Sequence, residues 1–187
     1  MNVLVKKTED VEVIWARRQE SIRGVLKLIR VMLLAVQKHS LQTEIQSQVS
    51  APELWILWEL NRAPGLRVLD LAKAMAIHVS SVRTMVMELE QRGLIRSLVS
   101  IDNPNVTRLS LTESGRYLVE EAPGPARGVI VDALERLDDP ALERLVDALQ
   151  PLIATMEYTD NAAALKPLAE LLNHKGITVA RPFQRGA

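Results

Sequence analysis

Apolar residues recur every three or four positions along most of this chain, and this spacing predicts a largely helical protein. The first such stretch covers residues 9–39 and predicts one long helix, either continuous or with a single break. Ser50 and Glu53 then match a capping box around Ala51 and Pro52. In such a box the serine side chain accepts a hydrogen bond from a free backbone amide of the first turn, and the glutamate side chain accepts one from the serine amide. A second helix is therefore expected to run from this box to Leu60.

Two short amphipathic helices are predicted after the turn at Pro64 and Gly65. Their apolar positions, spaced by three and four, are Val68, Leu71, Ala72 and Met75 in one helix and Val82, Met85, Val86 and Leu89 in the other. Only residues 76–79 separate the two patterns. Helices joined so tightly must cross at a steep angle, which predicts a helix-turn-helix.

The periodicity changes after Gly93, which we interpret as a helix C-terminal cap. Residues 94–111 read as two strands joined by a turn at residues 102–105, which are Asp, Asn, Pro and Asn. In the second strand the alternation places Thr107, Leu109 and Leu111 on one face and Arg108 and Ser110 on the other. A helix-turn-helix followed by such a hairpin is a winged helix.

Further helices are expected after the hairpin. Thr112 is a predicted N-cap, and Asp138 with Pro140 marks another helix start, after which an amphipathic pattern continues to Met156. A weaker helical pattern covers residues 162–172. We divide the chain into an N-terminal helix region (1–48), a winged helix (49–115), C-terminal helices (116–156) and an extension of unassigned role (157–187).

Composition narrows the possible classes of protein. The chain has 48% hydrophobic residues and no cysteine, so disulfides, thiolate metal sites and cysteine redox chemistry are excluded. Its longest apolar run, residues 31–36, is too short to span a membrane, and its start does not look like a signal peptide. We expect a cytoplasmic protein without a membrane partner.

Catalytic and metal chemistry find little support. Glu88 and Glu90 lie two positions apart on a predicted helix, so their carboxylates do not converge, and His39, His78 and His174 are far apart in sequence. No serine-histidine-acid set or glycine-rich phosphate loop is present in the sequence. We therefore expect no enzyme activity, no catalytic residue, no metal site and no cofactor.

The segments "LDLAKAMAIHVSSVRTMVMELEQRGLI" and "LTESGRYL" resemble the MarR family of winged-helix transcriptional regulators. The resemblance covers about residues 50–153 and rests on features at matching spacing: Leu71-Ala72, Val82, Gly93-Leu94-Ile95, and Leu111-Thr112 with Gly115. It implies a homodimer, a role as repressor, and a pseudo-palindromic operator in double-stranded DNA. The long first helix and the helix at Pro140 fall where this family has its dimerisation helices.

A homodimer is also expected from the residues themselves. A winged helix cannot bury both the long first helix and the helix after Asp139, whereas a twofold pairing of two chains would cover both apolar faces at once.

The chain departs from the family pattern in the wing and at the start of the second short helix. An aspartate and a minor-groove arginine are usual in the family's wing, and by spacing these fall on Asn103 and Asn105. His78 stands where the family has a small N-cap residue. The residues after Met156 lie outside the resemblance.

The polar face of the second short helix is the main candidate for DNA recognition. Its hydroxyl side chains suit phosphate at a helix N-terminus, Arg83 could reach a guanine, and Met87 could touch a thymine methyl. The alternative is an ordinary solvated face. The complete predicted DNA-binding set is His78, Ser80, Ser81, Arg83, Thr84, Met87, Asn103, Asn105, Thr107 and Arg108.

A small-molecule site is a further implication of the resemblance. Effectors of this family bind between the dimerisation helices and the winged helix, and here that crevice would be lined by Arg30, His39, Trp55, Trp58 and Arg62. Aromatic walls with cationic groups would suit a planar acid such as a substituted benzoate. The alternative is that both tryptophans are core or interface residues and Arg30 is solvated.

The charge balance leaves a second hypothesis open. The chain has 23 Lys and Arg and 23 Asp and Glu, whereas nucleic-acid binders usually carry a basic patch. One face of a neutral protein can still carry such a patch. Neutral charge and the missing wing arginine are nevertheless what we would expect of a winged-helix protein-interaction module that has lost DNA binding.

Overall fold

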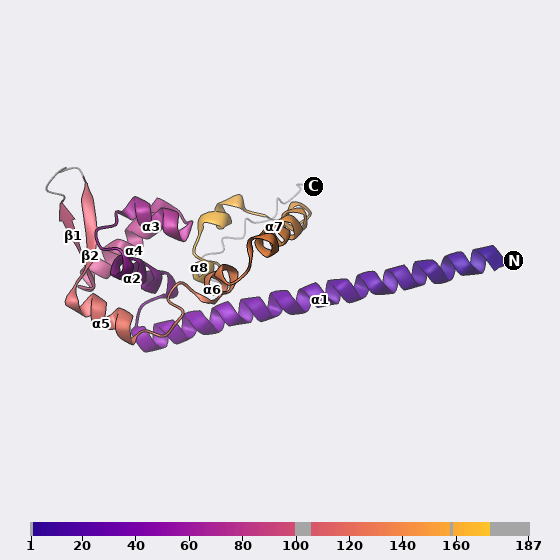
Figure 1. Ribbon diagram of the computed structural model, residues 1–187, viewed down its shortest axis with the longest axis horizontal. Coiled ribbons are helices and arrows are strands. Elements are labelled where there is room, and N and C mark those ends of the chain that lie inside the picture. Colours follow the sequence, from indigo (N-terminus) through magenta and orange to yellow (C-terminus); the bar gives the residue numbers. More distant parts are fainter. Residues whose placement is uncertain (1, 100–105, 158, 173–187) are drawn as a thin grey trace, which may run out of the picture.

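The computed structural model describes residues 2–99, 106–157 and 159–172 and confirms a mainly helical winged-helix fold (Figure 1). The winged helix comprises α2, α3, α4, β1 and β2, with one helix before it and further helices after it. The bounds are α1 Asn2–Ser47, α2 Ala51–Arg62, α3 Val68–Met75, α4 Val79–Gln91, β1 Ile95–Val99, β2 Thr107–Leu111, α5 Glu113–Glu121, α6 Val129–Glu135, α7 Asp139–Ala154, the 3-10 helix η1 Asn161–Leu165 and α8 Leu168–Leu172.

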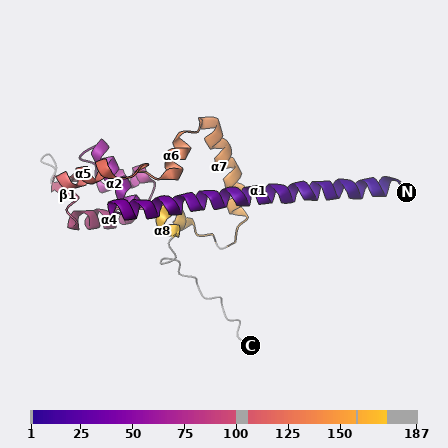
Figure 2. The same ribbon diagram turned by 90° about the horizontal axis from the view of Figure 1, so that it is seen from below.

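Helix α1 is longer than predicted and has no break. It has 46 residues, about 70 Å at the usual rise per residue, and contains no proline. Its N-terminal part extends well beyond the other elements in both views (Figures 1 and 2). Large apolar side chains are exposed along it: Val13, Ile14, Trp15, Ile22, Val25, Leu26, Leu28, Val31, Met32, Leu33, Leu34, Leu41 and Ile45.

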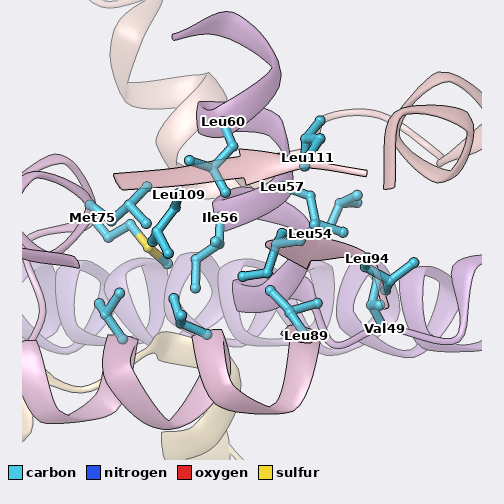
Figure 3. Close-up of a cluster of buried hydrophobic side chains, with 14 of the residues drawn as sticks. Val49, Leu54, Ile56, Leu57, Leu60, Met75, Leu89, Leu94, Leu109 and Leu111 are labelled. Atoms are coloured by element: carbon cyan, nitrogen blue, oxygen red, sulfur yellow. The ribbon is translucent and has the colours of Figure 1, made fainter. Parts of the chain in front are cut away.

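Helix α2 forms the centre of the hydrophobic core. Its side chains pack among residues of α3, α4 and the sheet, and those labelled in Figure 3 are Leu54, Ile56, Leu57 and Leu60. The predicted capping box is present, because the Ser50 amide donates to Glu53 Oε2 at 2.7 Å and the Glu53 amide donates to Ser50 Oγ. The helix continues two residues beyond the predicted end at Leu60.

The strands β1 and β2 pair antiparallel, with Ile95 opposite Leu111 and Val99 opposite Thr107. Leu109 and Leu111 are buried as predicted, but Thr107 is exposed. Thr107 is the first residue of β2 and pairs with Val99, so it is exposed although the strand alternation puts it on the same face as Leu109. The predicted turn at residues 102–105 lies outside the described residues.

Two backbone hydrogen bonds fix the base of the wing to the turn after α2. The amide of Gly65 donates to the Leu109 carbonyl, and the amide of Leu109 donates to the Leu66 carbonyl, each at 2.9 Å. The hairpin therefore keeps a fixed position beside the helix-turn-helix.

The start of α5 packs closely on the residues just before β1. Thr112 is the predicted N-cap, and its hydroxyl donates to the Gly93 carbonyl at 2.7 Å while accepting from the Gly115 amide at 3.1 Å. A Cβ added to Gly115 would lie 2.0 Å from the Leu94 carbonyl oxygen. Only glycine allows this approach, which gives a physical reason for the glycine of the "LTESG" segment.

The C-terminal elements differ from the prediction in two respects. Helix α6 was not predicted, and residues 162–172 do not form one helix. They form η1 and α8, separated at Lys166 and Pro167. Proline disfavours helical backbone at the preceding residue, and Lys166 is accordingly extended, with φ −101° and ψ 149°.

Helix α7 begins at the predicted Asp138 cap, whose carboxylate accepts from the Ala141 amide at 2.8 Å. It carries a stripe of exposed apolar side chains: Leu145, Val146, Leu149, Leu152 and Ile153. In the ranges that the structure describes, no helix is both long and apolar enough to cross a membrane.

Candidate nucleic-acid interface and ligand pocket

The turn between α3 and α4, residues 76–78, sets where the predicted recognition helix begins. Ala76 adopts the left-handed conformation with φ 53°, and His78 is the extended N-cap of α4. No side-chain cap bond is made by His78, in agreement with its being a poorer cap than serine or aspartate. At the other end, Arg92 Nη2 donates to the Gln48 carbonyl at 2.6 Å.

Helix α4 is amphipathic in the predicted sense. Val82, Val86 and Leu89 are buried in the core. The opposite face exposes Ser80, Arg83, Thr84 and Met87, and Ser81 is half-buried at the helix start. Met87 is 54% exposed, which is a large apolar exposure for a helix face that otherwise carries polar groups. This face presents hydroxyls, a guanidinium and an apolar tip along one line.

Of the predicted wing residues, the structure describes Thr107 and Arg108, and both are exposed. Arg108 makes a hydrogen bond near the base of the wing. Its Nη1 donates to the Gly65 carbonyl at 3.1 Å. Arg108 is thus tied to the turn after α2 and does not replace the missing wing-tip arginine. Asn103 and Asn105 lie outside the described residues, so their contribution stays a prediction.

An ion pair neutralises the beginning of α3. Arg67 Nη2 lies 2.8 Å from Asp70 Oδ1, and Arg67 Nε also donates to this carboxylate. The hydrogen bonds from Arg67 lower the pKa of Asp70 to about 2. Asp70 is therefore charged at neutral pH and holds Arg67 locally. Arg83 and Lys73 on the helix-turn-helix, and Arg96 on β1, are exposed basic residues.

A cavity of about 610 Å³ lies where α1, α2, the end of α3, α6 and the C-terminal elements meet. Most of its lining is apolar, and the polar side chains along it include those of His39, Ser40, Arg127, Glu135 and Lys166. Its volume is in the usual range for small-molecule sites.

Only two of the five predicted ligand residues line this cavity, His39 and Trp55. Arg30 is exposed on α1 and is not among the lining residues. Trp58 and Arg62 are not among the lining residues either. The Arg62 guanidinium stacks on the Trp58 ring at 5.5 Å, and Arg127, which does line the cavity, stacks on the same ring at 4.9 Å. Both tryptophans are half-buried.

The sequence reasoning missed Arg127 and Lys166, which are the cationic residues of the lining. Arg127 is paired with Glu135. His39 is buried, and its Nε2 has no hydrogen-bond partner within the part of the chain that the structure describes. A buried imidazole without a partner is costly, so a ligand that bonds to it would gain affinity.

Comparison with known proteins agrees with this architecture. Residues 49–104 match the model of the MarR family. The matched segment contains the helix-turn-helix and β1, so the chain is similar to the MarR family in this part. A curated relative, the HTH-type transcriptional repressor MdtR of Bacillus subtilis (strain 168), is 25% identical over 111 residues, which are 59% of this chain and 72% of the relative.

A solved structure of a MepR-like protein complexed with pseudoligands is also 25% identical, with a TM-score of 0.50 over 71% of this chain and 92% of that one. The chain is therefore similar to a transcriptional repressor in sequence and to a MepR-like protein in fold. The extension after residue 156 lies outside the matched family segment.

Proposed function

We propose that this protein is a MarR-family homodimeric repressor that binds double-stranded DNA sequence-specifically through α4. The observation that carries the proposal is the exposed face of α4, where Ser80, Arg83 and Met87 lie over a buried apolar face. Serine hydroxyls and the free amides of a helix N-terminus suit phosphate oxygens, and arginine suits the O6 and N7 acceptors of guanine. The repressor role follows the curated relative, and we assign its action to the cytoplasm.

The apolar faces of α1 and α7 support the homodimer. The long apolar stretch of α1 and the stripe on α7 are exposed in the single chain, over an area that monomeric proteins seldom leave in water. A second copy of the chain would cover both faces through one twofold interface. These helices also fall where the MarR family, which the sequence resembles, has its dimerisation helices.

The symmetry of such a dimer dictates the form of its operator. Two copies of α4 related by a twofold axis would enter successive major grooves, which requires a pseudo-palindrome with half-sites about one helical turn apart. Selection of bound duplexes from a random pool is expected to yield such a site. Enrichment of no common sequence would contradict sequence-specific binding.

A planar acid is the proposed effector, bound in the cavity. His39 and Trp55 remain from the predicted ligand set, and Lys166 and Arg127 supply the cationic groups that a carboxylate would require. Arg30, Trp58 and Arg62 are no longer proposed as direct ligand contacts, because none of them lines the cavity.

Salicylate is expected to change the tryptophan fluorescence and to lower DNA affinity in the same concentration range. A ligand releases DNA only if it prefers the non-binding arrangement, so both signals must be followed in one titration. A fluorescence change at constant DNA affinity would retain the pocket but contradict the switch. No change in either signal would contradict both.

Two observations support a second candidate function. The chain has no net charge, and Asn103 and Asn105 stand where the family has its charged wing pair. A winged-helix protein-interaction module without DNA affinity would have the same features. Its binding to DNA would be weak even at low salt.

A further inference from the structure

The C-terminal segment, residues 161–172, contacts both the long helix α1 and the winged helix, which we call the reading head. The segment consists of η1 and α8. The amide of His78 donates to the Leu165 carbonyl at 2.9 Å, and α8 packs against α1. Pro167, between the two short helices, is buried. Figure 1 shows this segment above α1 and beside the winged helix.

The contact with His78 lies at the start of the proposed recognition helix. His78 is the N-cap of α4, so its amide lies immediately before the first turn of the proposed recognition helix. The side chains of Ser80, Arg83 and Met87 remain exposed while this contact is made. The segment therefore contacts the N-terminal end of α4 and leaves the exposed face that carries these side chains accessible.

The segment is peripheral to the fold that it contacts. Among the described residues, the hydrophobic core and the side chains packed against it all lie within residues 49–126. Elements with few buried apolar contacts open at a lower free-energy cost than the core does. The segment can accordingly detach while the winged helix stays folded.

The segment also forms one wall of the cavity. Ala163, Ala164, Lys166, Pro167 and Leu171 line it on this side. Across the cavity lie His39 and Trp55, together with Ala76 and Ile77 of the helix-turn-helix turn. An occupant would contact the segment, α1 and the turn at once.

We infer that residues 161–172 are a brace that fixes the reading head relative to α1, and that a ligand in the cavity acts on DNA binding by displacing this brace. The inference rests on the proposed function for its DNA readout. In a dimer joined through α1, a fixed head would preset the separation of the two recognition helices. Losing the brace should then weaken binding to two half-sites much more than binding to one.

The test compares Pro167→Asp, which introduces a charge into the buried contact, with Ala162→Asp, which introduces the same charge at an exposed position of η1. Hydrogen exchange of the His78 amide reports docking without reference to DNA. We expect protection in the wild type and in Ala162→Asp and its loss in Pro167→Asp. Circular dichroism checks that the winged helix is folded in each variant. If the Pro167→Asp protein does not fold, Leu171→Asp replaces it as the test variant.

The DNA arm uses a selected full operator and a duplex with one half-site. We expect Pro167→Asp to lose about tenfold or more in affinity for the full operator and less than about twofold for the half-site, because only the full operator requires a preset separation. Salicylate should no longer lower the affinity of this variant. Ala162→Asp should behave as the wild type in both assays.

Three outcomes would overturn the brace. They are an unprotected His78 amide in the wild type, loss of protection without loss of affinity for the full operator, and equal losses on the full operator and the half-site. A folded wild type that binds no DNA would instead refute the proposed function, while the exchange measurement would still decide whether the segment docks.

Discussion

Leu149→Glu is expected to separate the dimer into monomers and to abolish high-affinity operator binding. Leu149 is 44% exposed at the centre of the apolar stripe of α7, and the structure gives this stripe no substantial partner within the described chain. Burying a carboxylate without a partner costs several kcal/mol, and a twofold interface contains the substitution twice. The dimer dissociation constant should rise by about a hundredfold or more, since each 1.4 kcal/mol is tenfold.

Sedimentation velocity at micromolar concentration measures this change, and Arg144→Glu is the control. Arg144 is exposed on α7 on the side of the helix away from the stripe, so this substitution also introduces a carboxylate but leaves the proposed interface unchanged. A wild-type chain that sediments as a stable monomer would contradict the homodimer, as would a Leu149→Glu variant that remains dimeric.

Among substitutions on the proposed DNA-contacting face, Arg83→Ala is expected to have the largest effect on operator recognition. A lost bidentate contact to guanine costs roughly 1–3 kcal/mol at each half-site, which is about 5- to 150-fold in affinity for that half-site. Because Arg83 is exposed and outside the core, the variant should keep the stability of the wild type. Fluorescence anisotropy with the selected operator measures the loss.

Two controls separate base recognition from charge. Arg116→Ala removes the same charge from α5, which packs mainly against α2 and not against α4, and should leave specificity unchanged. Asn105→Ala changes the predicted wing tip, where only neutral hydrogen bonds are available, and should cost less than Arg83→Ala. Equal losses from Arg83→Ala and Asn105→Ala would show that specificity lies in the wing as much as in α4.

Local patterns in the sequence predicted the winged helix well. The capping box at Ser50, the caps at Thr112 and Asp138, and the buried face of α4 all depend on residues a few positions apart, and the structure confirms each of them. The strict spacing of apolar residues needs no knowledge of distant neighbours. Elements of this kind are therefore accessible from one sequence.

Features that depend on distant segments were predicted poorly. The need for glycine at position 115 comes from the Leu94 carbonyl, which only the folded backbone brings close. The cavity joins α1 and α2 to the C-terminal segment, so Arg127 and Lys166 could not be connected with His39 by spacing. The stacking of Arg127 on Trp58 likewise joins residues far apart in sequence, so spacing could not predict it.

The salt dependence of binding to random-sequence duplex DNA tests the central claim most directly. A dimer that neutralises phosphates with Arg83, Lys73 and their neighbours should release counterions in proportion to the contacts made. We predict that the logarithm of the binding constant falls with the logarithm of salt concentration with a slope of about −4 or steeper. A slope near zero, or no binding at low salt, would contradict DNA recognition by this protein and favour the protein-interaction module.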